Sequence, residues 1–429
     1  MSLVDAPPAA NSWGPDEQTF ADGATTRGRV GLGRIVAGYS LVGLTWAITF
    51  LGSLAVLVPA KLAVIDPENK TADLSALVLF GAVISLLSNV LFGALSDRTR
   101  TRLGARNPWL LAGGAIASLG MVILGIAPGI AVLAIGWAVL NVGQTAFLSS
   151  VLAAVADRVA PRRQGLVSGV MGTSTTIAQS LGAIIAAQFV LTPDIGFWAL
   201  APIPVVGAVA IVLLIPDDSN VGAPRLPITA TTFTTVFAFP RNAPDFYWAL
   251  FGRLLIVVSF FMILSYQFFI LIDYMKLAPT SASSTISTAG LFSLVAGVVA
   301  GLLAGPVSDR LNRRKVPLYV ASVLLAIGAL APFLIPEPGS LVFFSATSGF
   351  GLGIYWAVDA ALVLRVLPNP LTVAKDLGLL AMANTGGQVI APIVVAVVVA
   401  AAGYRPVFLI AAACAVVGAI LVVPIRSVR

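Results

Sequence analysis

Long apolar stretches, separated by short polar segments, make up nearly the whole chain. Twelve of them reach the roughly 20 mostly apolar residues that a helix needs to cross a bilayer. None shows the alternating polarity of a membrane strand, and lipid forces a spanning segment to satisfy its own backbone. We therefore predict an all-α membrane protein with twelve transmembrane helices, at residues 35–64, 72–95, 108–126, 130–156, 165–191, 195–215, 246–272, 284–307, 316–335, 340–366, 376–400 and 405–425.

Composition supports a membrane protein and excludes several other classes. Hydrophobic residues make up 58% of the chain and charged residues 10%, with a mean hydropathy of +0.99. There is no histidine, and the single cysteine, Cys414, cannot form an internal disulfide. We find no nucleotide-binding loop, catalytic set or metal cluster, so we expect neither an enzyme nor a cofactor or metal. The basic residues lie in short bursts between apolar runs, which argues against a nucleic-acid partner.

The distribution of lysine and arginine predicts the orientation. All but four of the 25 Lys and Arg residues fall in the tails and the loops of one side; the exceptions are Lys61, Lys70, Lys276 and Arg405. The positive-inside rule then places both termini in the cytoplasm and the chain in the cytoplasmic membrane. Residues 1–30 are polar, lack the apolar core of a signal peptide, and are predicted to form a disordered cytoplasmic tail.

The chain repeats itself at a spacing of about 210 residues. Gly93 and the pair 97–98 match Gly305 and the pair 309–310, and three further pairs follow in the same order: 33–34 with 252–253, 158 and 161 with 365 and 368, and 169 and 179 with 378 and 388. We predict two pseudo-symmetric six-helix bundles, 31–216 and 245–429, joined by a cytoplasmic linker at 217–244. Repeats of this kind place a substrate site between the halves, near the middle of the membrane.

The phrase "GALSDR" at 93–98, followed by Arg102 and Arg106, resembles the signature loop of the major facilitator superfamily, and "GPVSDRLNRRK" at 305–315 resembles its second copy. This resemblance implies transport by alternating access. The segments 96–109 and 374–392 resemble sucrose–proton symporters and the glycoside–pentoside–hexuronide cation symporters more closely. The second helix lacks the paired aspartates of melibiose-type carriers, having only Asp73 and Asn89, which argues against their sodium coupling.

In the family that the loop resembles, this motif is a conformational latch. Gly93 would let helices approach closely, and an acid at the membrane face, Asp97, needs a basic partner or a helix N-terminus near Asp376. The alternative is that the arginines only fix topology and contact lipid phosphates. The predicted latch residues are Gly93, Asp97, Arg98, Arg158, Asp309, Arg310 and Arg365.

Asp359 is the one acid well inside a predicted span. It precedes Pro368 by nine residues, or about 13 Å of helix. Carboxyl groups inside a membrane are costly and usually functional, so we predict that Asp359 couples transport to protons. A structural ion pair with Arg365 or Arg253 is the alternative.

Polar and aromatic residues at helical spacing suggest a substrate site, because amides bond hydroxyls and rings stack on sugar faces. Interhelical hydrogen bonding is an equally common role for such residues in membranes. We expect Arg34 and Arg253, at the cytoplasmic starts of the first and seventh spans, to snorkel or to join an inter-half network, which leaves no deep arginine for an anion. The predicted substrate residues are Trp46, Asn141, Gln144, Gln179, Tyr266, Tyr355, Trp356, Asn384 and Gln388.

These features together predict a monomeric secondary transporter, with the lipid bilayer, a small-molecule substrate and the proton as its partners. The solute expected is small and neutral, most simply a sugar or glycoside. A proton-linked exporter of drugs or other apolar compounds is the alternative, although the fifth span lacks the proline that such exporters often carry. A membrane receptor that binds without transporting is a third possibility.

Overall fold

Helices form almost all of the structure, a computed structural model that describes residues 32–158, 161–216, 219–221, 243–311, 315–366 and 373–424. The predicted tail at 1–30 and most of the predicted linker at 217–244 lie outside these residues. Each of the twelve predicted spans falls on helix, and the described residues contain no strand, which confirms the all-α fold. Eleven helical segments are long and apolar enough to cross a bilayer, and α15 occupies the remaining predicted span, 340–366.

The N-terminal half contains six membrane-length segments, of which the first and the last are each built from more than one element. They are α2 (Leu32–Gly52) with η1 (Ser53–Leu57) and α3 (Val58–Ile65), α4 (Lys70–Arg98), α5 (Asn107–Ile126), α6 (Ile130–Arg158), α7 (Pro161–Ala187), and α8 (Pro193–Leu200) with α9 (Pro202–Leu214).

The C-terminal half has the same plan. Its segments are α11 (Pro244–Leu264) with α12 (Gln267–Phe269) and η2 (Ile270–Tyr274), α13 (Pro279–Leu311), α14 (Lys315–Leu334), α15 (Pro338–Val366), α16 (Val373–Ala402) and α17 (Arg405–Val422). We call the end where α2 begins and α17 ends the terminal end. The opposite end, which carries the connections 66–69, 127–129, 188–192, 275–278, 335–337 and 403–404, is the distal end.

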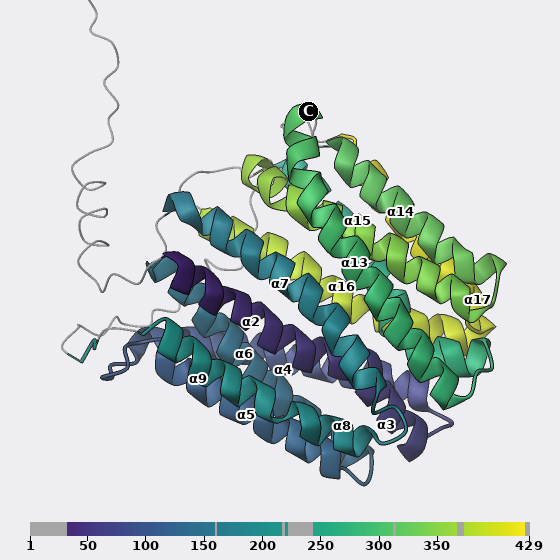
Figure 1. Cartoon of the computed structure of the whole chain (residues 1–429), viewed down its shortest axis with the longest axis horizontal. Coiled ribbons are helices and arrows are strands. Elements are labelled where there is room, and N and C mark those ends of the chain that lie inside the picture. The colour runs from purple at the N-terminus through teal and green to yellow at the C-terminus, as the bar shows by residue number, and fades with distance from the viewer. Residues whose placement is uncertain are drawn as a thin grey trace, which may run out of the picture.

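The two halves use the same helix neighbours and lie side by side (Figure 1). In the N-terminal half α5 packs on α6, α2 on α7, α4 on α6, and α9 on both α2 and α5. The corresponding pairs in the other half, α14 with α15, α11 with α16, α13 with α15, and α17 with α11 and α14, also pack. Between the halves, α7 packs on α13 and α16 on α4, which are equivalent pairs when the halves are exchanged. The repeat read from the sequence is therefore a pseudo-twofold relation in space.

Both halves carry a π-helical turn near the distal end of their first membrane segment. η1 spans Ser53–Leu57 and η2 spans Ile270–Tyr274, at matching places in the repeat. Single π-helical turns of this kind are rare and occur mostly at functional positions. η1 packs against α12, so these two irregular turns lie where the halves meet.

Apolar side chains form both the buried core and much of the exposed outer surface. The largest buried cluster contains residues of both halves, whereas a second cluster near the terminal end, around Tyr39, Leu110 and Ile211, belongs to the N-terminal half alone. Many long apolar side chains on the outside are exposed, among them Leu213 and Leu302. This exposed apolar surface suits lipid contact, because lipid solvates such side chains on the outside of the bundle.

Candidate functional site

An ion pair joins the two halves at the distal end. The Lys70 ammonium, at the start of α4, lies 2.8 Å from a carboxylate oxygen of Asp273 in η2. The Tyr404 hydroxyl donates to the other carboxylate oxygen at 3.1 Å, and the Lys70 ammonium lies 5.3 Å from the ring centroid of Phe269. Burial, together with the neighbouring Asp273 carboxylate, raises the pKa of Tyr404, so the hydroxyl keeps its proton and remains a donor. The halves are thus tied by a charge-assisted contact.

A second polar contact between the halves lies deeper. The hydroxyls of Ser75 and Tyr266 are 2.7 Å apart, and both bond to the backbone carbonyl of Pro392, at 2.9 and 3.2 Å. The Tyr266 hydroxyl also lies 2.8 Å from the carbonyl of Thr71, which shares the single hydroxyl proton with the carbonyl of Pro392. Tyr266 is fully buried. Its bonds to Thr71 and Ser75 join α4 to the C-terminal half in this conformation. Substrate contact by Tyr266 stays a prediction.

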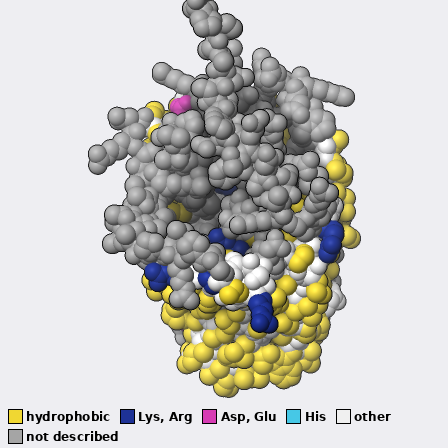
Figure 2. Space-filling model, turned by 90° about the vertical axis from the view of Figure 1, so that its left-hand side faces the viewer, with side chains coloured by type: hydrophobic (Ala, Val, Ile, Leu, Met, Phe, Trp, Pro, Cys, Tyr) yellow, Lys and Arg dark blue, Asp and Glu magenta, His cyan; other side chains and the backbone are white. Residues whose placement is uncertain are grey.

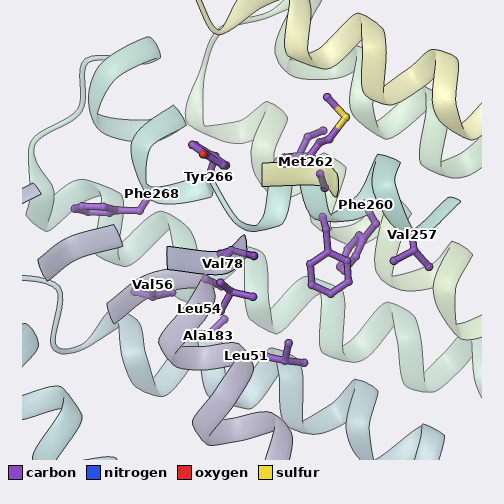
Figure 3. Packing of buried hydrophobic residues seen from close by; sticks show 14 of the residues in the cluster. Leu51, Leu54, Val56, Val78, Ala183, Val257, Phe260, Met262, Tyr266 and Phe268 are labelled. Atoms are coloured by element: carbon purple, nitrogen blue, oxygen red, sulfur yellow. The ribbon is translucent and has the colours of Figure 1, made fainter. Parts of the chain in front are cut away.

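Apolar side chains pack around these two groups of polar contacts. We call the Lys70–Asp273–Tyr404 and Ser75–Tyr266–Pro392 contacts, together with the apolar residues around them, the distal seal. Figure 3 shows side chains from both halves in one cluster. Its labelled residues are Leu51, Leu54, Val56, Val78 and Ala183 from the N-terminal half and Val257, Phe260, Met262, Tyr266 and Phe268 from the C-terminal half.

Close contact between α7 and α13 extends the seal. The Ser283 hydroxyl donates to the carbonyl of Ala187 at 2.5 Å, and the Gln188 amide donates to Ser287 at 3.0 Å. A Cβ placed on Gly290 of α13 would lie 2.7 Å from a side-chain carbon of Ile184 and 3.2 Å from the carbonyl oxygen of Ser180, so glycine favours this close approach of the two helices.

The terminal end has a different surface. Seen from that end, hydrophobic and basic side chains of the described residues are visible around and between the grey atoms (Figure 2). In the N-terminal half a separate apolar cluster occupies this end, whereas in the C-terminal half the shared cluster continues to it, through Phe246, Leu318 and Val422.

The structure describes only part of the predicted latch. Arg98 is exposed at the end of α4. A Cβ on Gly93 would meet none of the described residues within 4 Å, and the close helix approach at this glycine stays a prediction. The side chains of the remaining latch residues lie outside the described part of the structure; these are Asp97, Arg158, Asp309, Arg310 and Arg365.

The connection between α4 and α5 is folded on itself. Arg106 donates to the hydroxyl of Ser96 at 2.9 Å, and the Trp109 indole donates to the hydroxyl of Thr99 at 2.7 Å. The side chain of Asn220 accepts from the Thr101 amide and donates to the Thr99 carbonyl, both at 2.9 Å. Besides fixing the topology, this arginine-rich segment therefore forms hydrogen bonds that hold the connection between α4 and α5 in place.

Inside the N-terminal half, the predicted substrate amides bond to neighbouring helices. Gln144 of α6 donates to the hydroxyl of Thr49 at 2.9 Å. Asn141 accepts from Ser85 at 2.9 Å and donates to the Trp137 carbonyl at 2.8 Å. Both amide side chains are buried. These contacts fit the alternative role of interhelical hydrogen bonding.

Aromatic rings stack in a row beside these amides. Trp46 and Phe50 of α2 have ring centroids 5.7 Å apart, and Phe50 and Trp137 of α6 have centroids 5.4 Å apart. Both pairs are stacked. The N-terminal half therefore contains a row of stacked aromatic rings, in which Trp46 is half-buried.

The C-terminal half places a cation among its predicted substrate residues. Arg253 of α11 donates through Nε to the amide oxygen of Asn384 at 2.8 Å, and its guanidinium carbon lies 5.4 Å from the Trp356 ring centroid. Tyr355 packs edge-on against Trp356 at 5.3 Å. Three helices, α11, α15 and α16, thus converge on one guanidinium. This differs from the expected position of Arg253 at the edge of the bundle.

The other predicted residues have less defined surroundings. Gln179 of α7 and Gln388 of α16, which match in the repeat, are both half-buried. Asp359 lies on α15, three residues after Trp356 and therefore on the same side of the helix. The Asp359 side chain lies outside the described part of the structure.

Lys70, Asp273 and Tyr404 were not among the predicted site residues. Hydropathy gives little sign of them, because they stand at the ends of helices where charge is common. The sequence does contain one signal: Ser259, Tyr266 and Asp273 recur every seven residues along the seventh span. The spacing identifies one face of that span, but not the helices which that face meets.

Comparison with known proteins identifies both the family and the fold. Residues 37–304 and 255–429 match the sequence profile of the Major Facilitator Superfamily. No curated protein matches the sequence. Similar solved structures include a POT family transporter in complex with 5-aminolevulinic acid, with a TM-score of 0.70 at 13% identity over 93% of this chain and 98% of that one.

Two further structures have similar helix arrangements. One is the nucleoside transporter NupG, with a TM-score of 0.69 at 13% identity over 91% of this chain and 100% of that one. The other is a bacterial homolog of the human lysosomal transporter Spinster in an inward-facing, unoccupied conformation, with a TM-score of 0.66 at 12% identity over 91% of this chain and 97% of that one. At such low identity these likenesses establish the fold alone.

Proposed function

Because this chain belongs to the major facilitator superfamily, we propose that it is a secondary transporter that moves a small polar solute across the cytoplasmic membrane by alternating access. The observation that carries the proposal is the difference between its two ends. The hydrogen bonds and the ion pair found between described residues of the two halves lie toward the distal end, whereas at the terminal end the N-terminal half has an apolar cluster of its own. Two rigid halves that exchange such a seal between their ends expose a central site to one side at a time.

The distribution of lysine and arginine indicates which end of the molecule faces the cytoplasm. With both termini in the cytoplasm, the distal seal faces outward and the terminal end, where no such seal is described, faces the cytoplasm. The state is then inward-open. Gly93, Asp97, Arg98 and Arg158, with their counterparts Asp309, Arg310 and Arg365, are proposed to close the cytoplasmic side in the opposite state.

The solute is proposed to be a sugar or glycoside, or a related small polar compound. Aromatic rings at Trp46 and Trp356 suit the C–H faces of a sugar ring, and Asn384 and Gln388 offer amides to hydroxyls. For Asn141 and Gln144 the bonds to neighbouring helices favour the structural role. Gln179, Tyr266 and Tyr355 remain proposed contacts.

Proton coupling is proposed to use Asp359. It is an acid within a membrane helix of a chain that has no histidine, and it lies one turn from Trp356 on α15. A carboxyl that gains a proton on one side of the membrane and loses it on the other couples the solute to the proton gradient. If the proton and the solute move in the same direction, this coupling drives uptake. If they move in opposite directions, it drives export, as in the alternative of an exporter of apolar compounds.

Transport by the purified full-length chain in liposomes tests the proposal. We expect an inward proton gradient to drive accumulation of one or more members of a panel of radiolabelled mono- and disaccharides and their sugar acids, and expect counterflow exchange without a gradient. Efflux of apolar dyes without uptake of any polar solute would support the exporter instead. Saturable binding without flux would support a receptor and would contradict the proposal.

A further inference from the structure

We infer that Arg253, with Asn384 and Trp356, binds a negatively charged group of the solute, most simply a carboxylate. This inference rests on the proposed transport function and narrows its substrate class. It replaces the expectation of a neutral solute, which depended on finding no arginine inside the C-terminal half.

The position of Arg253 is the first argument. It lies nine residues after Pro244 within the membrane segment Pro244–Leu264, or roughly 14 Å along the helix. An arginine near a helix end usually extends its long side chain toward water. Arg253 is instead half-buried and held between α15 and α16 by its bond to Asn384 and its contact with Trp356. A charge kept inside a membrane segment is costly and marks a pathway for a solute or an ion.

The chemistry of the cluster is the second argument. A guanidinium has five N–H donors and no acceptor. Asn384 accepts from Arg253 through its oxygen, so its amide nitrogen keeps two donors. The described side chains of this cluster offer a cation and several donors, which match a ligand that carries negative charge and acceptors. A planar carboxylate fits the fork of a guanidinium through two parallel hydrogen bonds.

The orientation of the guanidinium is the third argument. Nε is bonded to Asn384 and the guanidinium carbon lies 5.4 Å from the Trp356 ring centroid, so the group is held by two contacts with the protein. A group held in this way loses little freedom when a ligand binds, which favours affinity. Arg253 has at least one further interaction. The proposal is compatible with it, because the two terminal nitrogens carry four donors and can serve more than one acceptor.

The repeat supplies a matched control. Arg34 corresponds to Arg253 in the repeated sequence, but it is exposed at the start of α2 and donates to the carbonyl of Leu213 at 3.1 Å. Removing the charge of Arg34 changes the net charge as much as removing that of Arg253 does. Any effect found only at Arg253 is then due to its place between α11, α15 and α16.

Thermal stabilisation of the full-length chain in detergent provides the binding test. The probes are matched pairs that differ in a carboxylate: glucuronate and glucose, galacturonate and galactose, glycerate and glycerol. A ligand that binds the folded state raises the melting temperature. We expect the acid of at least one pair to raise it and its neutral partner to have no effect. In the Arg253→Gln variant the Kd for that acid should rise by roughly 30-fold or more, because one partner of a charged pair is lost.

Two further variants separate recognition from folding. Arg253→Lys keeps the charge but loses the fork, and should bind the acid with intermediate affinity; Arg34→Gln should bind it normally. Three results would each overturn the inference. They are a rise in melting temperature with the neutral compounds alone, a rise with an acid that is unchanged in Arg253→Gln, and no rise with any acid. If neutral sugars exchange in liposomes equally well with Arg253→Gln, the inference fails while the transport function stands. If no solute crosses the membrane at all, the proposed function itself fails.

Discussion

The two halves of this transporter share one arrangement of helices but differ in what they place inside it. In the N-terminal half, Asn141 and Gln144 bond to neighbouring helices beside a row of stacked aromatic rings. In the C-terminal half, the guanidinium of Arg253 lies between Asn384 and Trp356. Pseudo-symmetry of the backbone therefore does not extend to the chemistry of the interior. Near the middle of the membrane segments, the described residues place stacked aromatic rings and buried amides in one half and a guanidinium in the other.

The largest expected effect comes from the acid of the C-terminal half. One proton moving down a gradient of one pH unit supplies about 1.4 kcal/mol, enough for roughly tenfold accumulation. We expect Asp359→Asn to abolish accumulation of the solute in liposomes, because an amide carries no proton across, while counterflow exchange is partly retained. Glu337→Gln, which removes an exposed acid between α14 and α15, should accumulate normally. Normal accumulation by Asp359→Asn would remove this residue from the coupling mechanism.

Packing in the two halves should respond differently to one added methyl group. A Cβ on Gly143 of α6 would overlap the backbone of Ala117 in α5, whereas one on Gly328 of α14 would overlap only the side chain of Thr347. We expect Gly143→Ala to lower the free energy of unfolding by about 2 kcal/mol, since backbone atoms cannot rotate away. Gly328→Ala should be close to neutral, because the helix gains about 1 kcal/mol from losing a glycine. Equal melting temperatures of the two variants would contradict this difference.

The Lys70–Asp273 pair, which joins the halves, should have a smaller effect. We expect Asp273→Asn to weaken the distal seal by about 1 kcal/mol, because the pair is only partly buried, and so to favour the outward-open state roughly fivefold. Spin labels at Glu68→Cys and Thr280→Cys in a Cys414→Ala background would report this as a larger population of long distances between the halves. Tyr404→Phe, which removes a single hydroxyl, should shift the population less. An unchanged distance distribution in Asp273→Asn would exclude the pair from the seal.

The smallest effect is expected at Gln144 of the N-terminal half. Gln144→Ala loses its hydrogen bond to Thr49, whose hydroxyl still donates to the carbonyl of Thr45. The loss in unfolding free energy should be about 1 kcal/mol, the usual net value of one hydrogen bond. The Kd for the solute should change less than in Asn384→Ala. A larger loss of affinity in Gln144→Ala would restore this glutamine to the binding site and weaken the contrast between the halves.

The sequence by itself determined the helices, their number and their pairing into a repeat. Lipid offers no hydrogen bonds, so every spanning segment must be a helix of sufficient apolar length, and that requirement can be read locally. The polar and aromatic residues of the interior could also be named, since they interrupt apolar runs at helical spacing. Asn384 and Trp356 were among them.

Only the tertiary structure decided which of these residues meet and which conformation they hold. Lys70 and Asp273 are separated by 203 residues, and Arg253 and Asn384 by 131. Such pairs depend on how whole helices pack, and helical spacing fixes only the face on which each residue lies. The matching positions of Arg34 and Arg253 gave no sign that one is exposed and the other half-buried, because the environment of a side chain is made by neighbouring helices.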